Sequence, residues 1–60
     1  MRIREMRERA KLTQKDLAVE MGMDRSAIAK WETDAALPTA DKLPKLAQVL
    51  GCTIDELFRA

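Results

Sequence analysis

Histidine is absent from the sequence, cysteine occurs once, at Cys52, and the aromatic residues are one tryptophan and one phenylalanine. A structural zinc site therefore has no ligand set, and a single cysteine cannot form an internal disulfide. The sequence also lacks a glycine-rich phosphate loop and a nucleophile paired with a base, so we expect no enzyme, no cofactor and no small-molecule ligand. The lone thiol suits a reducing compartment and predicts a cytoplasmic location.

Long apolar runs are absent as well. No stretch approaches the roughly 20 residues of a transmembrane helix, and the amino terminus lacks a signal-peptide pattern, so we expect no membrane partner. Alternating Val, Ile, Thr or Tyr, which would indicate strands, does not occur. The sequence predicts a single all-α domain over residues 1–60. So small a domain buries only about 60% of its unfolded surface and needs an economical core.

Two short helices joined by one tight turn are predicted between Thr13 and Thr33. In each segment, apolar residues recur three or four positions apart and define one buried side. Gly22 lies between the segments and can adopt the positive φ that a sharp turn requires. Thr13 and Asp24 are the expected N-caps, each between apolar residues that fix where the helix starts, and Asp16 can complete a capping box with Thr13.

The second helix of this pair, predicted over about residues 25–33, has a polar outer face. Ile28 and Trp31 point inward, whereas the outer face carries two cations, two hydroxyls and no acid. The residues on this face are Arg25, Ser26, Ala29, Lys30 and Thr33. Such a helix can lie in the major groove of DNA, and the alternative is an ordinary solvated helix face.

Charge is distributed unevenly although the net charge is only +1. Residues 1–30 carry eight cations and five anions, and residues 31–60 carry three cations and five anions. A surface that binds nucleic acid needs a local cluster of basic residues more than it needs a high net positive charge over the whole chain. The positive half is the half that contains the helix pair.

A first helix is predicted over residues 2–10, with Arg7 inside its apolar stripe. An unpaired cation there is costly, so Arg7 must find a partner or extend to solvent at the edge of the stripe. Glu32, which flanks the apolar side of the third helix, is the candidate partner. Gln14 lies at the start of the second helix, where its amide can donate to a phosphate or brace a neighbouring side chain.

The start of the fourth helix depends on Pro44, which costs about 3 kcal/mol in a helix interior. With Asp41 as N-cap, Pro44 falls in the first turn, where its missing N–H is not required. We therefore expect the helix to start at Asp41 and to end at Gly51. Its predicted inner stripe is Leu43, Leu46, Ala47 and Leu50.

A short fifth helix is predicted after Thr53, which serves as N-cap and forms a capping box with Glu56. Cys52 is expected to pack as a small hydrophobic residue rather than to act as a reactive thiol. The apolar residues expected to complete the core are Ile54, Leu57 and Phe58.

Four groups of residues carry a resemblance that spans nearly the whole chain, from Ile3 to Phe58. They are Leu12-Thr13-Gln14…Leu17-Ala18…Gly22, Ile28…Lys30-Trp31-Glu32, Pro38, and Leu46-Ala47…Leu50-Gly51…Leu57. Together they resemble the phage repressor and Cro type of helix-turn-helix DNA-binding domain, also called the xenobiotic-response-element family. The resemblance implies a compact five-helix, lambda-repressor-like fold with the helix-turn-helix at the second and third helices. It also implies a sequence-specific transcriptional regulator that binds double-stranded DNA as a homodimer on a palindromic operator.

The resemblance further implies roles for individual residues. Those expected to contact base edges are Arg25, Ser26 and Lys30. Those expected to contact the DNA backbone are Thr13, Gln14, Lys15 and Thr33. Arg7 and Glu32 are expected to form an ion pair inside the fold. Many family members carry a glycine and basic residues after the third helix, where this chain reads Thr33-Asp34-Ala35-Ala36-Leu37, so this loop lacks the basic side chains that would strengthen phosphate contacts.

An alternative function on the same fold is a protein-interaction module, such as an antitoxin or an antirepressor, with weak or no DNA binding. Ala35-Ala36-Leu37 favours it, because this segment forms a small apolar patch in an exposed loop.

The Leu37-Pro38 loop and the start of the fifth helix, at Thr53 and Ile54, are the expected contacts between two copies of the chain.

Overall fold

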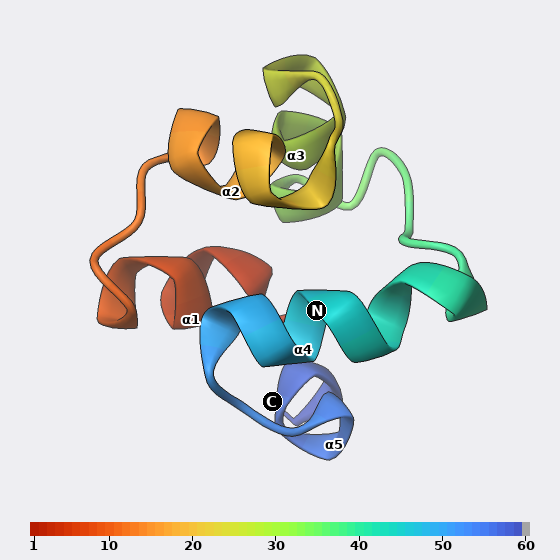
Figure 1. Ribbon diagram of the computed structural model, residues 1–60. Coiled ribbons are helices and arrows are strands. Elements are labelled where there is room, and N and C mark those ends of the chain that lie inside the picture. The colour runs from red at the N-terminus through yellow and green to blue at the C-terminus, as the bar shows by residue number, and fades with distance from the viewer. Residues whose placement is uncertain (60) are drawn as a thin grey trace.

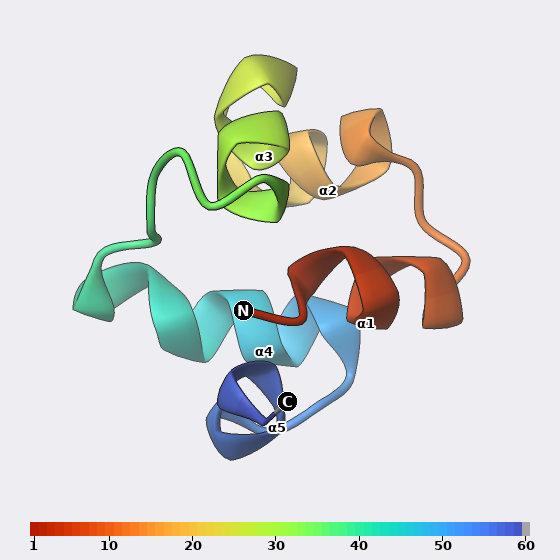
Figure 2. The same ribbon diagram turned by 180° about the vertical axis from the view of Figure 1, so that it is seen from behind.

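The computed structural model describes residues 1–59, and Ala60, the last residue of the predicted domain, lies outside the described residues. Residues 1–59 form five α-helices, one short 3-10 helix and no strand. The elements are α1 (Ile3–Arg9), α2 (Gln14–Met21), α3 (Arg25–Glu32), η1 (Ala40–Lys42), α4 (Leu43–Leu50) and α5 (Ile54–Phe58). The predicted five-helix, all-α class is confirmed. In Figures 1 and 2, α2 and α3 form the upper part of the molecule, α1 and α4 lie below them, and α5 lies beneath α4.

Each of the first four α-helices is followed by a residue in the left-handed conformation. These residues are Lys11 (φ 61°), Gly22 (φ 66°), Asp34 (φ 61°) and Gly51 (φ 68°). The N–H of the next residue donates each time to the carbonyl oxygen five positions earlier, at 2.9 or 3.0 Å. This pattern satisfies carbonyl groups that a helix end leaves unpaired. The sharp turn predicted at Gly22 is confirmed.

Two of the predicted N-caps use their side chains. Thr13 Oγ1 accepts a hydrogen bond from the Asp16 N–H at 3.0 Å, and the Thr13 N–H donates to Asp16 Oδ2 at 2.9 Å. Thr53 and Glu56 form the same reciprocal pair at the start of α5. Both predicted capping boxes are confirmed. Asp24 is the N-cap of α3 as predicted, but its side chain makes no capping hydrogen bond.

The predicted start of the fourth helix is wrong. The 3-10 turn η1 comes first, and α4 follows with Lys42, not Asp41, as its N-cap. Pro44 is the second residue of α4. In a continuous α-helix the carbonyl oxygen of Ala40 would accept a hydrogen bond from the backbone N–H of residue 44, and Pro44 has no such N–H. The N–H of Leu43 donates to that oxygen instead, so the 3-10 turn accommodates the proline.

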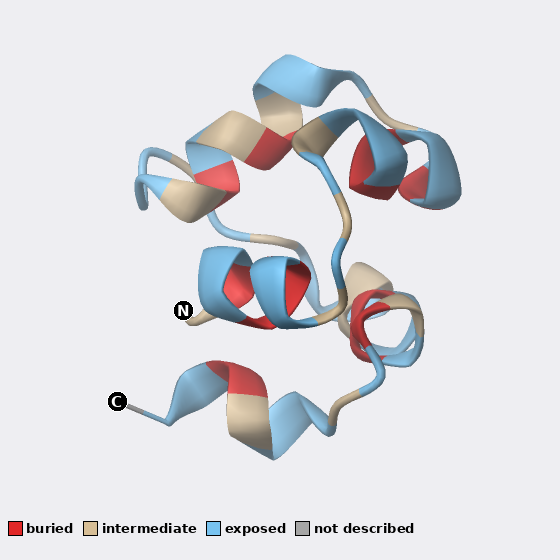
Figure 3. Ribbon diagram, turned by 90° about the vertical axis from the view of Figure 1, so that its left-hand side faces the viewer, coloured by how far each residue is buried: buried red, intermediate tan, exposed pale blue. Residues whose placement is uncertain are grey.

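The core of residues 1–59 lies where the inner sides of all five α-helices meet (Figure 3). Its buried apolar residues are Ile3, Met6, Leu17, Ala18, Met21, Ile28, Trp31, Leu46, Ala47, Leu50 and Leu57. Leu43, predicted in the inner stripe of the fourth helix, is only half-buried. The Arg2 N–H donates to the carbonyl oxygen of Leu57 at 2.9 Å and joins the start of α1 to α5.

The prediction that Ile54 and Phe58 complete the core is wrong. Their exposed fractions are 38% and 60%, whereas Leu57 is fully buried. A helix turns about 100° per residue, so Phe58 points well away from the direction of Leu57. A helix of only five residues has room for one fully inward side chain. Cys52 packs against the core as a partly buried residue, as expected.

Candidate nucleic-acid interface

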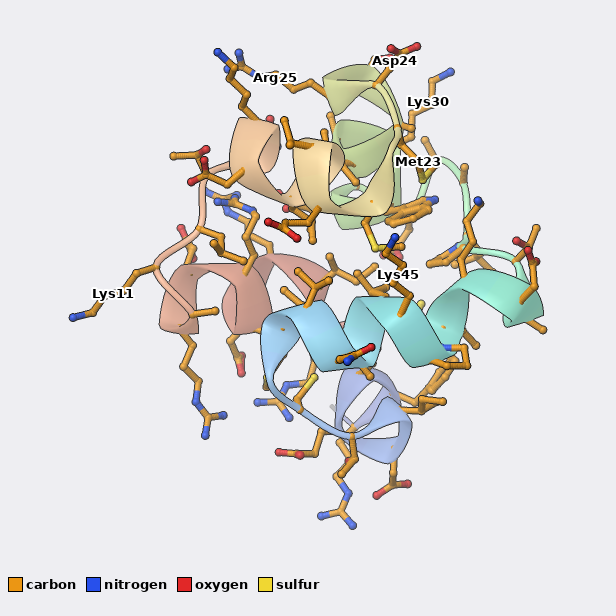
Figure 4. All side chains as sticks on the ribbon, viewed as in Figure 1. Lys11, Met23, Asp24, Arg25, Lys30 and Lys45 are labelled. Carbon is orange, nitrogen blue, oxygen red and sulfur yellow. The ribbon has the colours of Figure 1, made fainter. Side chains whose placement is uncertain are left out.

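The helix α3 is held by its apolar side and presents its polar side to solvent. Ile28 and Trp31 are buried in the core, while Arg25, Ser26 and Lys30 are exposed. The amino-terminal end of α3 lies at the top of the molecule, away from α4 and α5 (Figure 1). Figure 4 shows Arg25 and Lys30 extending from α3 in different directions. The residues expected to contact base edges are thus gathered on one accessible helix.

Several cations of this region are not engaged by acids. The ion pairs of residues 1–59 involve the amino terminus and the side chains of Arg2, Arg4, Arg7 and Arg59. Lys15, Arg25 and Lys30 are not among them, so their charges are available to an external partner. No ion pair joins Arg25 to the neighbouring Asp24 in the described residues, so this acid does not hold Arg25 away from an external partner.

A buried network fixes α3 relative to α1 and α2. Arg7 Nε donates to Glu32 Oε2 at 2.6 Å, and Arg7 Nη2 donates to Glu32 Oε1 at 3.2 Å. Gln14 Nε2 donates to Glu32 Oε1 at 3.1 Å, and Arg7 Nη1 donates to the carbonyl oxygen of Leu12 at 2.8 Å. This is the Arg7–Glu32 pair expected from the sequence, and the Leu12 carbonyl is a partner that the sequence did not indicate.

The network keeps Glu32 charged although only 4% of its side chain is exposed. Burial opposes ionisation, but the hydrogen bonds from Arg7 and Gln14 outweigh it and hold the pKa of Glu32 below its usual value. The hydrogen bond to Glu32 likewise raises the pKa of Arg7. Because both charges are paired and hydrogen-bonded, the burial of this ion pair is tolerated.

The residues expected to contact the DNA backbone lie at both ends of the helix pair. Lys15 is exposed at the start of α2, whereas Gln14 is half-buried and braces Glu32. The hydroxyl oxygen of Thr13 accepts the capping hydrogen bond described above. The Thr33 hydroxyl donates back to Ala29 O at 3.1 Å, so its proton is used within the end of α3. Lys15 is therefore the residue of this group whose polar atoms are least engaged.

A surface hollow of about 570 Å³ lies beside α3, between the turn that joins α2 to α3 and the loop that follows α3. Its lining residues are Gly22, Met23, Asp24, Ser26, Ala27, Lys30, Trp31 and Ala36. Helical periodicity did not reveal it, because it depends on where the loop places Ala36. That residue packs against the core, so the apolar loop patch expected at residues 35–37 is reduced to Leu37, which is 66% exposed, and Ala35.

Within residues 1–59, no three His, Cys, Asp or Glu side chains are arranged to hold a metal ion. None of the helices in this part of the chain combines the length and the apolarity that a membrane crossing requires. Burial raises the pKa of the Cys52 thiol, which disfavours the reactive thiolate.

Comparison with known proteins matches residues 3–57 to the helix-turn-helix family. The chain is 34% identical over 57 residues to the HTH-type transcriptional activator BcrR of Enterococcus faecalis, an alignment that covers 95% of this chain and 28% of the relative. It is 36% identical over 56 residues to the cryptic phage CTXphi transcriptional repressor RstR of Vibrio cholerae, which covers 93% of this chain and 50% of that relative. The chain thus spans half or less of the length of these relatives. No solved structure matches it.

Proposed function

The chain belongs to the helix-turn-helix family, of the phage repressor and Cro type, and we propose that it is a sequence-specific DNA-binding regulator of transcription. In this proposal α3 enters the major groove with its amino-terminal end first. Arg25, Ser26 and Lys30 contact base edges, and Thr13, Gln14, Lys15 and Thr33 face the backbone. Such a regulator works beside chromosomal DNA, in keeping with the expected cytoplasmic location.

The observation that carries the proposal is that the polar face of α3 is exposed and its cations have no acidic partner in the described residues. The orientation of α3 is fixed by contacts on the side that faces the rest of the fold. Arg25 and Lys30 have no acidic partner within residues 1–59, while Glu32, at the end of the same helix, is locked to Arg7. A base-reading helix needs both features, because its side chains must be free while its backbone is held in place. The two relatives named as transcriptional regulators support the same function.

We further propose that the regulator acts as a homodimer on a palindromic operator. One small module buries too little surface for high specificity, and paired modules read half-sites about one helical turn apart. The exposed apolar side chains available for a self-complementary contact include Leu37, Ile54 and Phe58. Two of these belong to the contact expected from the sequence, and the exposure of Phe58 adds to it.

Duplex binding measured over a series of salt concentrations tests the DNA-binding proposal. The logarithm of the binding constant should fall linearly with the logarithm of salt concentration, with a slope of about −0.9 per phosphate neutralised. Sedimentation with and without a selected duplex tests the dimer. A monomer under both conditions would refute the homodimer, and binding that does not respond to salt would refute the phosphate contacts.

The alternative of a protein-interaction module is favoured by one observation. Leu37 is exposed in the loop after α3, where many family members carry basic residues that this chain lacks. A chain that binds no duplex at low salt but forms a stable complex with another protein through this loop would establish this alternative. Substitution of Leu37 by Ser would then abolish that complex.

A further inference from the structure

One carboxylate at the DNA-facing end of α3 has no structural role within residues 1–59. Asp24 has the extended backbone of an N-cap, with φ −74° and ψ 148°, yet its side chain makes no capping hydrogen bond. Thr13 and Thr53, the N-caps of α2 and α5, both cap through their side chains. Asp24 also forms no ion pair in the described residues, although Arg25 follows it directly.

Asp24 shares a surface with two of the residues proposed to read bases. Together with Ser26 and Lys30 it provides the polar side chains that line the hollow beside α3. In Figure 4, Asp24 lies on the same side of the molecule as Lys30, whereas Arg25 extends toward the opposite side. The side chain is exposed, so its oxygens remain available to an external hydrogen-bond donor.

The chemistry of the major groove restricts what such a group can contact. An ionised carboxylate only accepts hydrogen bonds, and phosphates repel it. Guanine N7 and O6 and thymine O4 are themselves acceptors, which leaves the amino groups of cytosine and adenine. Adenine places the acceptor N7 beside its amino group, whereas cytosine presents only the N4 donor.

We infer that Asp24 is a specificity-determining residue that accepts a hydrogen bond from the N4 amino group of a cytosine in each half-site. The inference rests on the proposed function. An unpaired negative charge at the DNA surface weakens binding to every duplex, because it repels the phosphates. Asp24 therefore lowers general affinity and increases discrimination, and these two effects can be measured separately.

The test compares the parental chain with Asp24→Ser and Asp24→Asn in selections from randomised duplexes. Ser is a residue type that is accepted at N-cap positions and lacks the carboxylate, while Asn can contact adenine N6 and N7 together. The parental chain should select cytosine at one position in each half-site. Asp24→Ser should lose this preference by about 10- to 150-fold, the range that corresponds to one hydrogen bond to a charged group, and Asp24→Asn should shift it toward adenine.

Affinity for unselected duplexes provides the second readout, and both Asp24 variants should bind them more tightly than the parent does. Glu20→Gln is the matched control, because Glu20 is an exposed acid of α2 that forms no ion pair within residues 1–59. This control removes the same charge and should keep the parental base preference. Because Asp24 makes no cap bond and Glu20 is exposed and forms no ion pair in the described residues, all three variants should unfold at temperatures close to that of the parent.

Two results would overturn the inference, and they differ in what else they refute. If both Asp24 variants bind every duplex more tightly but keep the parental preference at each position, Asp24 acts only by repulsion, and the proposed function survives. If the parental chain binds no duplex at any salt concentration, the proposed function fails together with the inference.

Discussion

Gln14, the first residue of α2, donates its side-chain amide to Glu32, the last residue of α3, with 3.1 Å between Nε2 and Oε1. The same oxygen receives Arg7 Nη2 at 3.2 Å. The end of α2 proposed to face the DNA backbone is thereby tied to the helix proposed to read bases. A backbone contact near Gln14 would therefore set how deeply α3 enters the groove.

Substitution of Gln14 by Ala should weaken binding to all duplexes to a similar extent without changing base preference. A backbone contact carries no sequence information directly, and its loss acts on every sequence alike. The same variant should lower the free energy of unfolding by about 1.5–3 kcal/mol, the usual contribution of a hydrogen bond to a charged group. Equilibrium titrations on several duplexes, with urea unfolding, measure both effects. A change in base preference would contradict the assignment.

Substitution of Glu32 by Gln should destabilise the fold strongly. Arg7 would then be a buried cation without a charged partner, and breaking one side of a buried ion pair costs about 3–5 kcal/mol. Urea unfolding followed by the fluorescence of Trp31 measures the loss. Glu8→Gln is the control, because Glu8 is exposed and should contribute little. An unchanged midpoint for Glu32→Gln would show that the pair adds nothing to stability.

The same carboxylate predicts how stability depends on pH. The pKa of Glu32 is lowered in the folded state, so its contribution is fully present above the unfolded value of about 4.3. This contribution should be lost as the pH falls from there through the lower folded pKa. Unfolding free energies measured between neutral pH and acid should therefore fall less steeply in Glu32→Gln than in the parent. Parallel curves would contradict the prediction.

Substitution of Arg25 by Ala should relax base preference at one position in each half-site. Arginine can contact guanine O6 and N7 together, which contributes about 1–3 kcal/mol of discrimination. Selection from a randomised half-site library measures the change. Arg59→Ala is the control of the same residue type, because Arg59 pairs with Asp55 in α5, remote from α3. If Arg25→Ala kept the parental preference at every position, Arg25 would not be a base-reading residue.

The four left-handed helix ends predict opposite effects of substitution at Lys11 and Gly22. Lys11→Gly should stabilise the fold and Gly22→Ala should destabilise it, each by about 1 kcal/mol, because the left-handed conformation is unfavourable for residues with a Cβ atom. A Cβ added at Gly22 meets nothing within 4 Å beyond its chain neighbours, so its cost comes from the local backbone conformation and not from contacts with the rest of the fold. Thermal unfolding of the two variants measures both changes. Equal signs would show that backbone strain does not control these positions.

The features predicted correctly from the sequence mostly depend on residues close together in the chain. The exception is the Arg7–Glu32 pair, which is predicted because a charged residue lies inside an apolar stripe. Thr13 with Asp16 and Thr53 with Glu56 are only three residues apart, so short-range rules suffice for the capping boxes. Arg7 could be paired with Glu32 across the fold because a cation inside an apolar stripe requires a partner. Helical periodicity likewise indicated Ile28 and Trp31 as the buried side of α3.

The errors arise where a local rule competes with tertiary placement. Asp41 is a reasonable N-cap by residue type, but the preceding 3-10 turn removes the conflict at Pro44 and moves the start of the helix. Phe58 is apolar, but the single turn of α5 directs it away from the core. Asp24 occupies the N-cap position without using its side chain. The sequence cannot distinguish a position that permits a cap from a side chain that makes one.

The hydrogen bond from the Arg2 N–H to the Leu57 carbonyl oxygen brings the two ends of the described chain to the same region of the molecule. Both ends lie in the lower half of Figures 1 and 2, whereas the amino-terminal end of α3 lies at the top. A fluorescent tag or a second domain fused after residue 59 would therefore emerge away from the helix-turn-helix, whereas one fused before residue 1 would emerge beside Asp34, which pairs with the Met1 amino group in the loop after α3. A fusion at the carboxyl-terminal end should leave the face of α3 uncovered, so this end is the better attachment point for a second domain.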